Sequence, residues 1–151
     1  MEKRKVVIVS GYFNPIHKGH LELFKKSQEH GDFLIVIVNS DKQRKLKGSL
    51  EFMDENERLM IVQAIKYVGH AFISIDQDRT QIESLKYLHK QFGSIWDLHF
   101  VNGGDQNNGR VISEIERVGE NTPMAVREVD KLGQEDLAAR GSFIDVQATD
   151  Q

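Results

Sequence analysis

Two histidines, His17 and His20, stand three residues apart at the predicted beginning of a helix. This spacing places both imidazoles on one face of the helix. A helix N-terminus presents free backbone N–H groups and the positive end of the helix dipole, so it is a natural site for phosphate. A phosphate-binding helix start that carries two imidazoles indicates phosphoryl or nucleotidyl chemistry.

A predicted strand and a tight turn must position these histidines. The strand covers about Lys5 to Ser10, and its β-branched run is typical of a strand covered on both faces. Gly11 lacks a Cβ, so the backbone there can turn and approach a ligand closely. Asn14 and Pro15 form a turn signal. The helix that follows is predicted from about Gly19 to His30.

The next apolar run, Phe33 to Val38, predicts a second buried strand. A strand, a crossover helix and a strand form a right-handed unit with a parallel sheet. Ligands bind such sheets at the carboxyl ends of the strands. We therefore expect residues 10–14 and 39–41 to lie near one crevice.

The remaining chain continues the alternation of strands and helices. Its predicted elements are a basic loop over Lys42 to Gly48, a helix that starts at the Asp54 cap and continues through Ile65, a strand over 71–75, a helix over 80–92, a strand over 98–101, a helix over 111–118 and a fifth strand over 125–129. Few apolar residues follow Asp130, so residues 131–151 are predicted as a separate segment or tail.

Two motifs resemble a known enzyme family. His17-Lys18-Gly19-His20 matches the HxGH signature of the nucleotidyltransferase superfamily, and residues 11–16 resemble the G-x-F-[DN]-P-[IV] run that precedes it there. The resemblance covers about residues 5–130 and implies a nucleotidyltransferase domain over residues 1–130. It implies a Rossmann-like three-layer α/β/α fold with a mostly parallel five-stranded sheet. It also implies that a phosphorylated acceptor attacks the α-phosphate of a nucleoside triphosphate and releases pyrophosphate.

The same resemblance assigns roles to individual residues. His17 and His20 would donate hydrogen bonds to phosphate oxygens, and Lys47 and Arg58, which stand in L-K-G and E-R-x-x-[IV] blocks, would join them as catalytic residues. The resemblance places nucleotide binding at Gly11, Tyr12, Phe13, Asn14, Gly19, Gly103, Gly104 and Asp105. Asn14 stands where many family members carry aspartate, so a negative charge is removed from beside the triphosphate. For Lys42, Arg44 and Lys45, a solvated basic loop is an equal alternative.

The family's final motif, a serine- and threonine-rich helix start that binds the β- and γ-phosphates, is missing. The nearest candidate is residues 140–144, in which Ser142 keeps one hydroxyl and would contact the nucleotide. Three readings stay open: a divergent enzyme, a remodelled tail that replaces the motif, or a nucleotide-binding module without turnover.

Composition limits the classes of function. With 151 residues the chain is predicted to form one domain with a single core, and a net charge of −3 argues against nucleic-acid binding. The chain has no cysteine, which excludes thiolate metal sites, and no metal-binding cluster is expected. Its apolar runs are too short to cross a bilayer. We expect a cytoplasmic homodimer that does not bind membranes and whose triphosphate carries Mg²⁺.

The nucleotide and the acceptor stay open at this point. The compact chain resembles glycerol-phosphate cytidylyltransferases, which favours CTP, whereas the Leu46-Lys47-Gly48 block resembles heptose-phosphate adenylyltransferases, which favours ATP. The acceptor would be a small phosphorylated alcohol or sugar. An NAD-dependent dehydrogenase is disfavoured because no G-x-G-x-x-G run follows the first strand.

Overall fold

The computed structural model describes residues 2–101, 115–119, 145–146 and 148–149. A five-stranded sheet with the order β3-β2-β1-β4-β5 forms its centre. Its strands are β1 (Arg4–Gly11), β2 (Phe33–Val38), β3 (His70–Ile73), β4 (Trp96–Val101) and β5 (Ile115–Arg117). The helices are α1 (Lys18–Glu29), α2 (Asp41–Lys47), α3 (Glu55–Gln63) and α4 (Ile82–Phe92). A separate antiparallel pair joins β6 (Asp145–Val146) to β7 (Ala148–Thr149).

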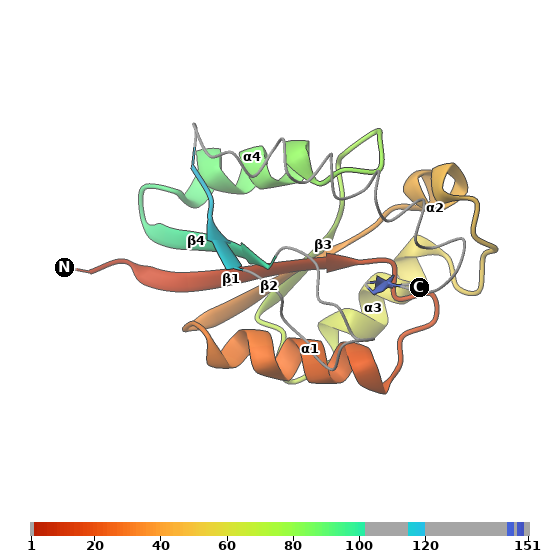
Figure 1. Ribbon diagram of the computed structural model, residues 1–151, viewed down its shortest axis with the longest axis horizontal. Coiled ribbons are helices and arrows are strands. Elements are labelled where there is room, and N and C mark those ends of the chain that lie inside the picture. Colours follow the sequence, from red (N-terminus) through yellow and green to blue (C-terminus); the bar gives the residue numbers. More distant parts are fainter. Residues whose placement is uncertain (1, 102–114, 120–144, 147, 150–151) are drawn as a thin grey trace.

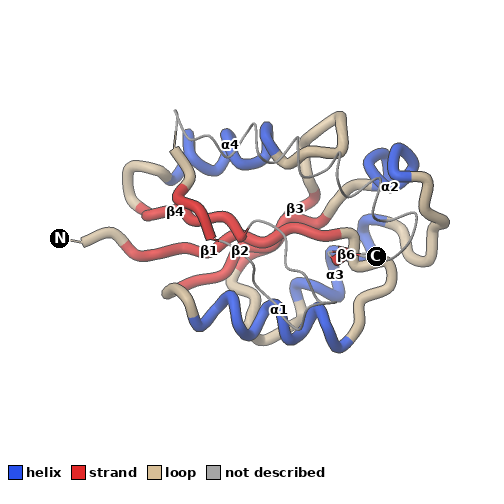
Figure 2. The backbone as a smooth tube through the Cα atoms, viewed as in Figure 1, coloured by secondary structure: helices blue, strands red, loops and turns tan. Residues whose placement is uncertain are grey.

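The central strand β1 pairs in parallel with β2 on one side and β4 on the other. Its side chains alternate between two apolar layers, as the period of a strand requires. Val7 and Val9 pack in the cluster that contains Phe24 of α1 and Val62 of α3. Val6 and Ile8 belong to the opposite cluster, which α4 joins through Leu85 and Leu88. Helices therefore cover both faces of the sheet, and the predicted three-layer Rossmann-like fold is confirmed (Figures 1 and 2).

The carboxyl ends of β1 and β2 meet at the edge of the sheet where α2 lies (Figure 1). The backbone N–H of Asn39 donates to the carbonyl of Gly11 at 2.8 Å, so the two chains stay paired as they leave the sheet. The prediction that residues 10–14 and 39–41 lie together is confirmed.

Several predicted elements differ from the structure. Residues 42–48, predicted as a basic loop, belong mostly to α2, because Ser40 and Gln43 form a capping box that starts a helix. Residues 115–117, predicted as part of a helix, form β5, which pairs antiparallel with β4. The α3 helix ends at Gln63, before Ile65, and β3 covers 70–73 instead of 71–75.

Some predictions fall on residues outside the described ranges. They are the strand over 125–129, the domain limit at residue 130, the Gly103-Gly104-Asp105 turn and Ser142. In the described part of the chain, no helix combines the length and the apolar character that a transmembrane span needs.

Candidate active site

The two histidines build the first turn of α1 together. His17 is the N-cap residue, with extended backbone at φ −148°, and its Nδ1 accepts a hydrogen bond from the N–H of Gly19 at 3.0 Å. His20 returns the contact, because its Nδ1 accepts from the N–H of His17 at 3.0 Å. The rings lie 3.9 Å apart between centroids with an interplanar angle of 33°. A pair of imidazoles thus fills the role that serine and glutamate usually take in a capping box.

These contacts assign the position of the ring protons. A nitrogen that accepts a hydrogen bond carries no proton, so each neutral ring holds its proton at Nε2. His17 and His20 therefore each offer an Nε2–H donor at the helix start. The arrangement provides two preoriented donors for an anion.

Burial keeps both rings neutral. His20 is 1% exposed, and the edge of its ring meets Phe13 at a centroid distance of 5.0 Å and an angle of 80°. Burial, and to a smaller extent the neighbouring His17, lowers the pKa of His20 to about 2. Burial also lowers the pKa of His17. Near neutral pH the pair therefore carries no charge.

The first turn of α1 differs from the other helix starts in its charge. It contains no acidic residue, whereas the first turns of α2, α3 and α4 each contain at least one, namely Asp41, Glu55 with Glu57, and Glu83. The carboxylate of buried Asp76 also accepts from the N–H groups of Glu83 and Ser84 at 2.7 and 2.9 Å, so it occupies the start of α4. The α1 start is the one among these helices that is left favourable for an external anion.

The turn before α1 packs against the histidine pair through Phe13. Phe13 has a positive φ of 53°, and its ring is buried against His20 and Phe24. A Cβ at Gly11 would lie 2.7 Å from the Phe13 ring, so glycine there makes room for that ring. The side chain of Phe13 therefore packs in the core and holds His20, which leaves the turn's backbone as the part that could contact a nucleotide.

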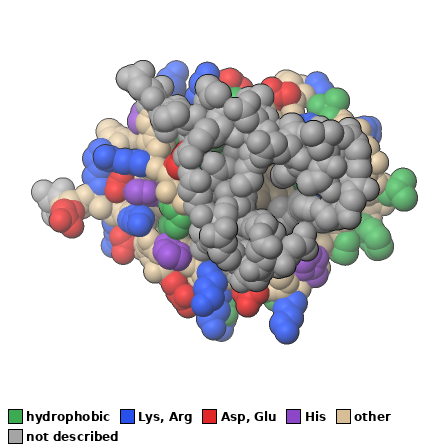
Figure 3. All heavy atoms as spheres, viewed as in Figure 1, with side chains coloured by type: hydrophobic (Ala, Val, Ile, Leu, Met, Phe, Trp, Pro, Cys, Tyr) green, Lys and Arg blue, Asp and Glu red, His purple; other side chains and the backbone are tan. Residues whose placement is uncertain are grey.

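Asn14 connects the turn to the loop between α2 and α3. Its Nδ2 donates to the carbonyl of Leu50 at 2.7 Å, and its Oδ1 accepts from the N–H groups of Phe52 and Met53. An aspartate could not make the first of these bonds. The side chains of Leu50 and Phe52 are 87% and 73% exposed, and hydrophobic side chains gather at the edge of the molecule where this loop lies (Figure 3).

Lys47 lies at the same edge as the last residue of α2. Its Nζ is 4.4 Å from the centroid of the Tyr12 ring, which is a cation–π distance. The Tyr12 hydroxyl approaches the carbonyl of Gln43 at 3.5 Å. Gly48 ends the helix in the left-handed conformation at φ 86°. The helix that replaces the predicted loop therefore fixes Lys47 beside the turn that leads to the histidines.

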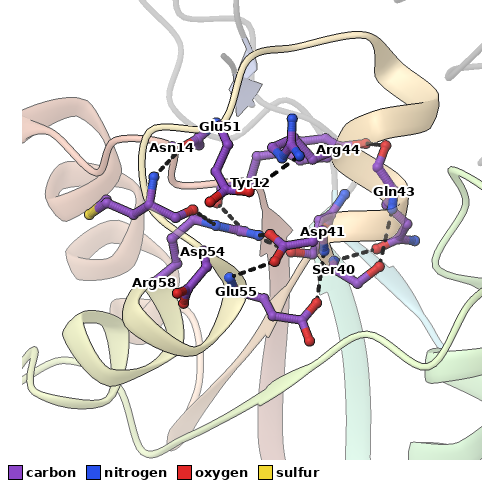
Figure 4. A network of polar contacts seen from close by, with 12 residues as sticks. Tyr12, Asn14, Ser40, Asp41, Gln43, Arg44, Glu51, Asp54, Glu55 and Arg58 are labelled. Atoms are coloured by element: carbon purple, nitrogen blue, oxygen red, sulfur yellow. Dashed lines mark hydrogen bonds and ion pairs between the residues drawn. The ribbon is translucent and has the colours of Figure 1, made fainter.

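Arg58 is buried beneath this edge (Figure 4). Its Nε donates to the carbonyl of Met53, one terminal nitrogen donates to the carbonyls of Tyr12 and Asn39, and the other donates to Asp41. The side chain is 0% exposed. The resemblance predicted a catalytic arginine that points toward the site, and the structure places its guanidinium among protein acceptors.

The structure thus brings together, at one edge of the sheet, the predicted residues Gly11, Tyr12, Phe13, Asn14, His17, Gly19, His20, Lys47 and Arg58. Sequence reasoning placed residues 39–41 at this crevice but did not foresee that Asn39 and Asp41 accept from Arg58, and it missed the role of Gln43. The serine and glutamine of the capping box were the available signal. Within the described ranges, no group of three or more His, Cys, Asp or Glu side chains is placed to hold a metal ion.

Comparison with known proteins adds the family. The sequence model of the cytidylyltransferase-like family matches residues 8–149. The glycerol-3-phosphate cytidylyltransferase of Staphylococcus aureus is 36% identical over 64 residues, which cover 42% of this chain and 48% of that protein. An FAD synthase of Thermoplasma volcanium is 34% identical over 79 residues, or 51% of this chain and 56% of that protein. The chain thus matches about half the length of these relatives.

A third relative and a solved structure are also similar to this chain. The bifunctional protein HldE of Azorhizobium caulinodans is 31% identical over 116 residues, which cover 72% of this chain and 24% of that protein. The crystal structure of the lipopolysaccharide core biosynthesis protein from Thermoplasma volcanium has a TM-score of 0.55 at 23% identity and covers 86% of this chain and 89% of that chain, a likeness in fold. Since the family model spans nearly the whole chain, this protein belongs to the cytidylyltransferase-like family.

Proposed function

We propose that this protein is a nucleotidyltransferase that moves a nucleoside monophosphate from a triphosphate to a small phosphorylated alcohol or sugar. The observation that carries the proposal is the start of α1, where two neutral imidazoles offer Nε2–H donors and no acidic residue stands in the first turn. Membership of the cytidylyltransferase-like family supports it. Neutral donors suit a substrate that brings its own negative charge.

In the proposed reaction an oxygen of the acceptor phosphate attacks the α-phosphorus of the triphosphate. The new P–O bond forms as the bond to the β-phosphate bridging oxygen breaks, and pyrophosphate leaves with that electron pair. His17 and His20 donate hydrogen bonds to the phosphate oxygens on which charge grows, and each ring keeps its proton. Lys47 supplies positive charge beside Tyr12. Positioning and charge stabilisation, without a covalent enzyme intermediate, account for the rate.

Mg²⁺ is proposed as a companion of the triphosphate. The described residues offer no ligand set that fits a resident metal, since no group of three carboxylate or imidazole side chains converges there. We therefore assign no step of the reaction to a protein-held ion. The cation would neutralise charge on the β- and γ-phosphates when the nucleotide binds.

We propose CTP as the nucleotide, with ATP as the alternative. The family description and the S. aureus relative support cytidylyl transfer, whereas the Leu46-Lys47-Gly48 resemblance favours ATP. The acceptor panel should include glycerol phosphate, heptose phosphates and FMN. FMN belongs there because the exposed Leu50 and Phe52 suit an apolar ring system and an FAD synthase is among the relatives. The homodimer and the cytoplasmic location stay predictions.

The test is a screen for pyrophosphate release with each of the four nucleoside triphosphates against this panel. We expect release that depends on both the nucleotide and the acceptor, with one pair clearly preferred. Calorimetric titration with CTP and ATP runs in parallel. Nucleotide binding without product from any acceptor would contradict the proposal and favour a non-catalytic binding module.

A further inference from the structure

Helix α3 carries a buried arginine, Arg58, whose role can be inferred from its hydrogen-bond acceptors. Arg58 is 1% exposed as a residue, and a guanidinium removed from water is costly unless its donors are paired. All three nitrogens of Arg58 donate to protein acceptors, at distances from 2.7 to 3.0 Å. The pairing leaves this side chain well placed to hold its neighbours and badly placed to reach a substrate.

The four acceptors of Arg58 come from three separate stretches of the chain. One terminal nitrogen lies between the carbonyls of Tyr12 and Asn39, at 2.7 Å from each, and so ties the ends of β1 and β2 together. The other reaches the carboxylate of Asp41, the first residue of α2, at 2.8 Å. Nε holds the carbonyl of Met53 in the loop before α3 at 3.0 Å. One side chain thus connects the turn after β1, the junction of β2 and α2, and the loop before α3 (Figure 4).

Asp41 extends this connection. Its Oδ1 accepts from Arg58, while its Oδ2 accepts from the N–H of Glu55 at 3.2 Å. The N–H of Asp41 in turn donates to the carboxylate of Glu55 at 2.8 Å. The first turns of α2 and α3 are therefore locked to each other and to the guanidinium, and α2 carries Lys47 at its other end.

We propose that Arg58 is a positioning residue, which sets the distance between the histidine turn and Lys47 through the Tyr12 carbonyl and Asp41. The inference rests on the proposed nucleotidyl transfer. Arg58 itself contacts no substrate. It holds the turn that precedes His17 and the helix that carries Lys47. The positions of His17 and Lys47 relative to the triphosphate are thereby fixed.

The test compares Arg58→Lys, Asp41→Asn and the double variant by steady-state kinetics with the preferred substrates. A lysine cannot serve four acceptors, so Arg58→Lys should lower kcat about 10- to 100-fold and change the triphosphate KM by less than about threefold, since small misplacements cost rate. Asp41→Asn should lower kcat less. The double variant should be no worse than Arg58→Lys, because both changes break one connection.

Val62→Ala is the matched control, because Val62 is fully buried on the same helix and packs in the core. It should lower the melting temperature and leave kcat of the folded protein unchanged. An Arg58→Lys variant that behaves like Val62→Ala would overturn the positioning role. A large rise in triphosphate KM, with Asp41→Asn adding fully to it, would also overturn it in favour of direct phosphate contact.

Amide hydrogen exchange separates this proposal from the proposed function. In Arg58→Lys, exchange should rise in residues 11–20 and 41–47, and in Val62→Ala it should not rise selectively there. If the wild type forms no product, the transferase assignment fails, while the exchange pattern still decides whether Arg58 fixes the two segments. Unchanged exchange in both segments would refute the proposal.

Discussion

The starts of α1 and α4 differ in the groups that accept hydrogen bonds from their first backbone N–H groups. Each follows a parallel strand of the same sheet, and its first N–H groups have no acceptor within the helix itself. At α4 the protein supplies the anion itself, because Asp76 accepts from Glu83 and Ser84 and is buried beside Ser74 and Ser84. At α1 the cap is made of two neutral rings. We therefore expect the start of α1, and not the start of α4, to accept a phosphate.

The largest expected effect breaks the α1 side of this comparison. His20→Ala removes one donor from the start of α1 and should lower kcat about 10²–10³-fold, as loss of one preoriented donor typically does. The triphosphate KM should change much less, because the contact strengthens as charge builds in the transition state. Steady-state kinetics on folded protein measure this. Wild-type turnover in the variant would remove the histidines from the reaction.

The second prediction breaks the α4 side. Asp76→Ala leaves the N–H groups of Glu83 and Ser84 without their acceptor, which should lower the free energy of unfolding by about 1–3 kcal/mol. The kcat of the folded protein should stay the same. Urea denaturation gives the stability, with Lys86→Ala as the exposed control on the same helix, expected within about 0.5 kcal/mol of wild type. A loss of turnover as large as that of His20→Ala would make the two helix starts equivalent.

The third prediction uses pH to test whether the imidazole of His20 in the α1 cap is uncharged in the folded protein. The pKa of His20 is lowered from 6.5 to about 2 in the folded chain, so the unfolded chain alone takes up this proton as the pH falls below 6.5. The native state should therefore lose stability over that range, by up to about 1.4 kcal/mol per pH unit from this group. Denaturation at pH 7.5, 6.0 and 5.0 should reveal a shallower dependence in His20→Asn. Equal slopes would mean that His20 takes up its proton in the fold.

The smallest expected effect makes α1 resemble the other helices. Lys18→Glu puts an acid into the first turn of α1, which should stabilise the helix by about 0.3–1 kcal/mol and raise the triphosphate KM several-fold. Helix stability should improve while triphosphate binding weakens, because the new carboxylate occupies the position proposed for phosphate. Lys25→Glu carries the same charge change further along the helix and should leave KM within about twofold of wild type. Equal KM values for both variants would argue for a general charge effect.

The strands and the histidine pair were predictable because their signals are local. The run Val6–Val9 is apolar throughout, as a strand covered on both faces must be, and it forms the centre of β1. The HxGH spacing places both rings on one turn without help from distant residues. The same holds for Asp54, whose side chain caps α3 as its sequence pattern predicts.

The errors arose where distant contacts decide. Residues 42–48 carry four basic side chains, which suggested a solvated loop, but buried Gln43 donates to the carbonyls of Asp78 and Thr80 and holds the segment as a helix. Residues 115–117 became a strand because Ile115 pairs with Val101. The partners of Arg58 were equally hidden, since its acceptors lie up to 46 residues away and most are backbone carbonyls.

The position of the single tryptophan has a practical consequence for spectroscopy. Trp96 stacks on Phe92 at a centroid distance of 4.5 Å, lies 5.9 Å from Phe33, and pairs with Arg4 at the amino end of β1. The histidine turn begins beyond Gly11, seven strand residues and about 23 Å away. Intrinsic tryptophan fluorescence will therefore follow unfolding of this aromatic cluster and stay unchanged when a nucleotide binds at the opposite edge. A labelled nucleotide must supply the optical signal for binding, and the native indole remains an independent reporter of the fold.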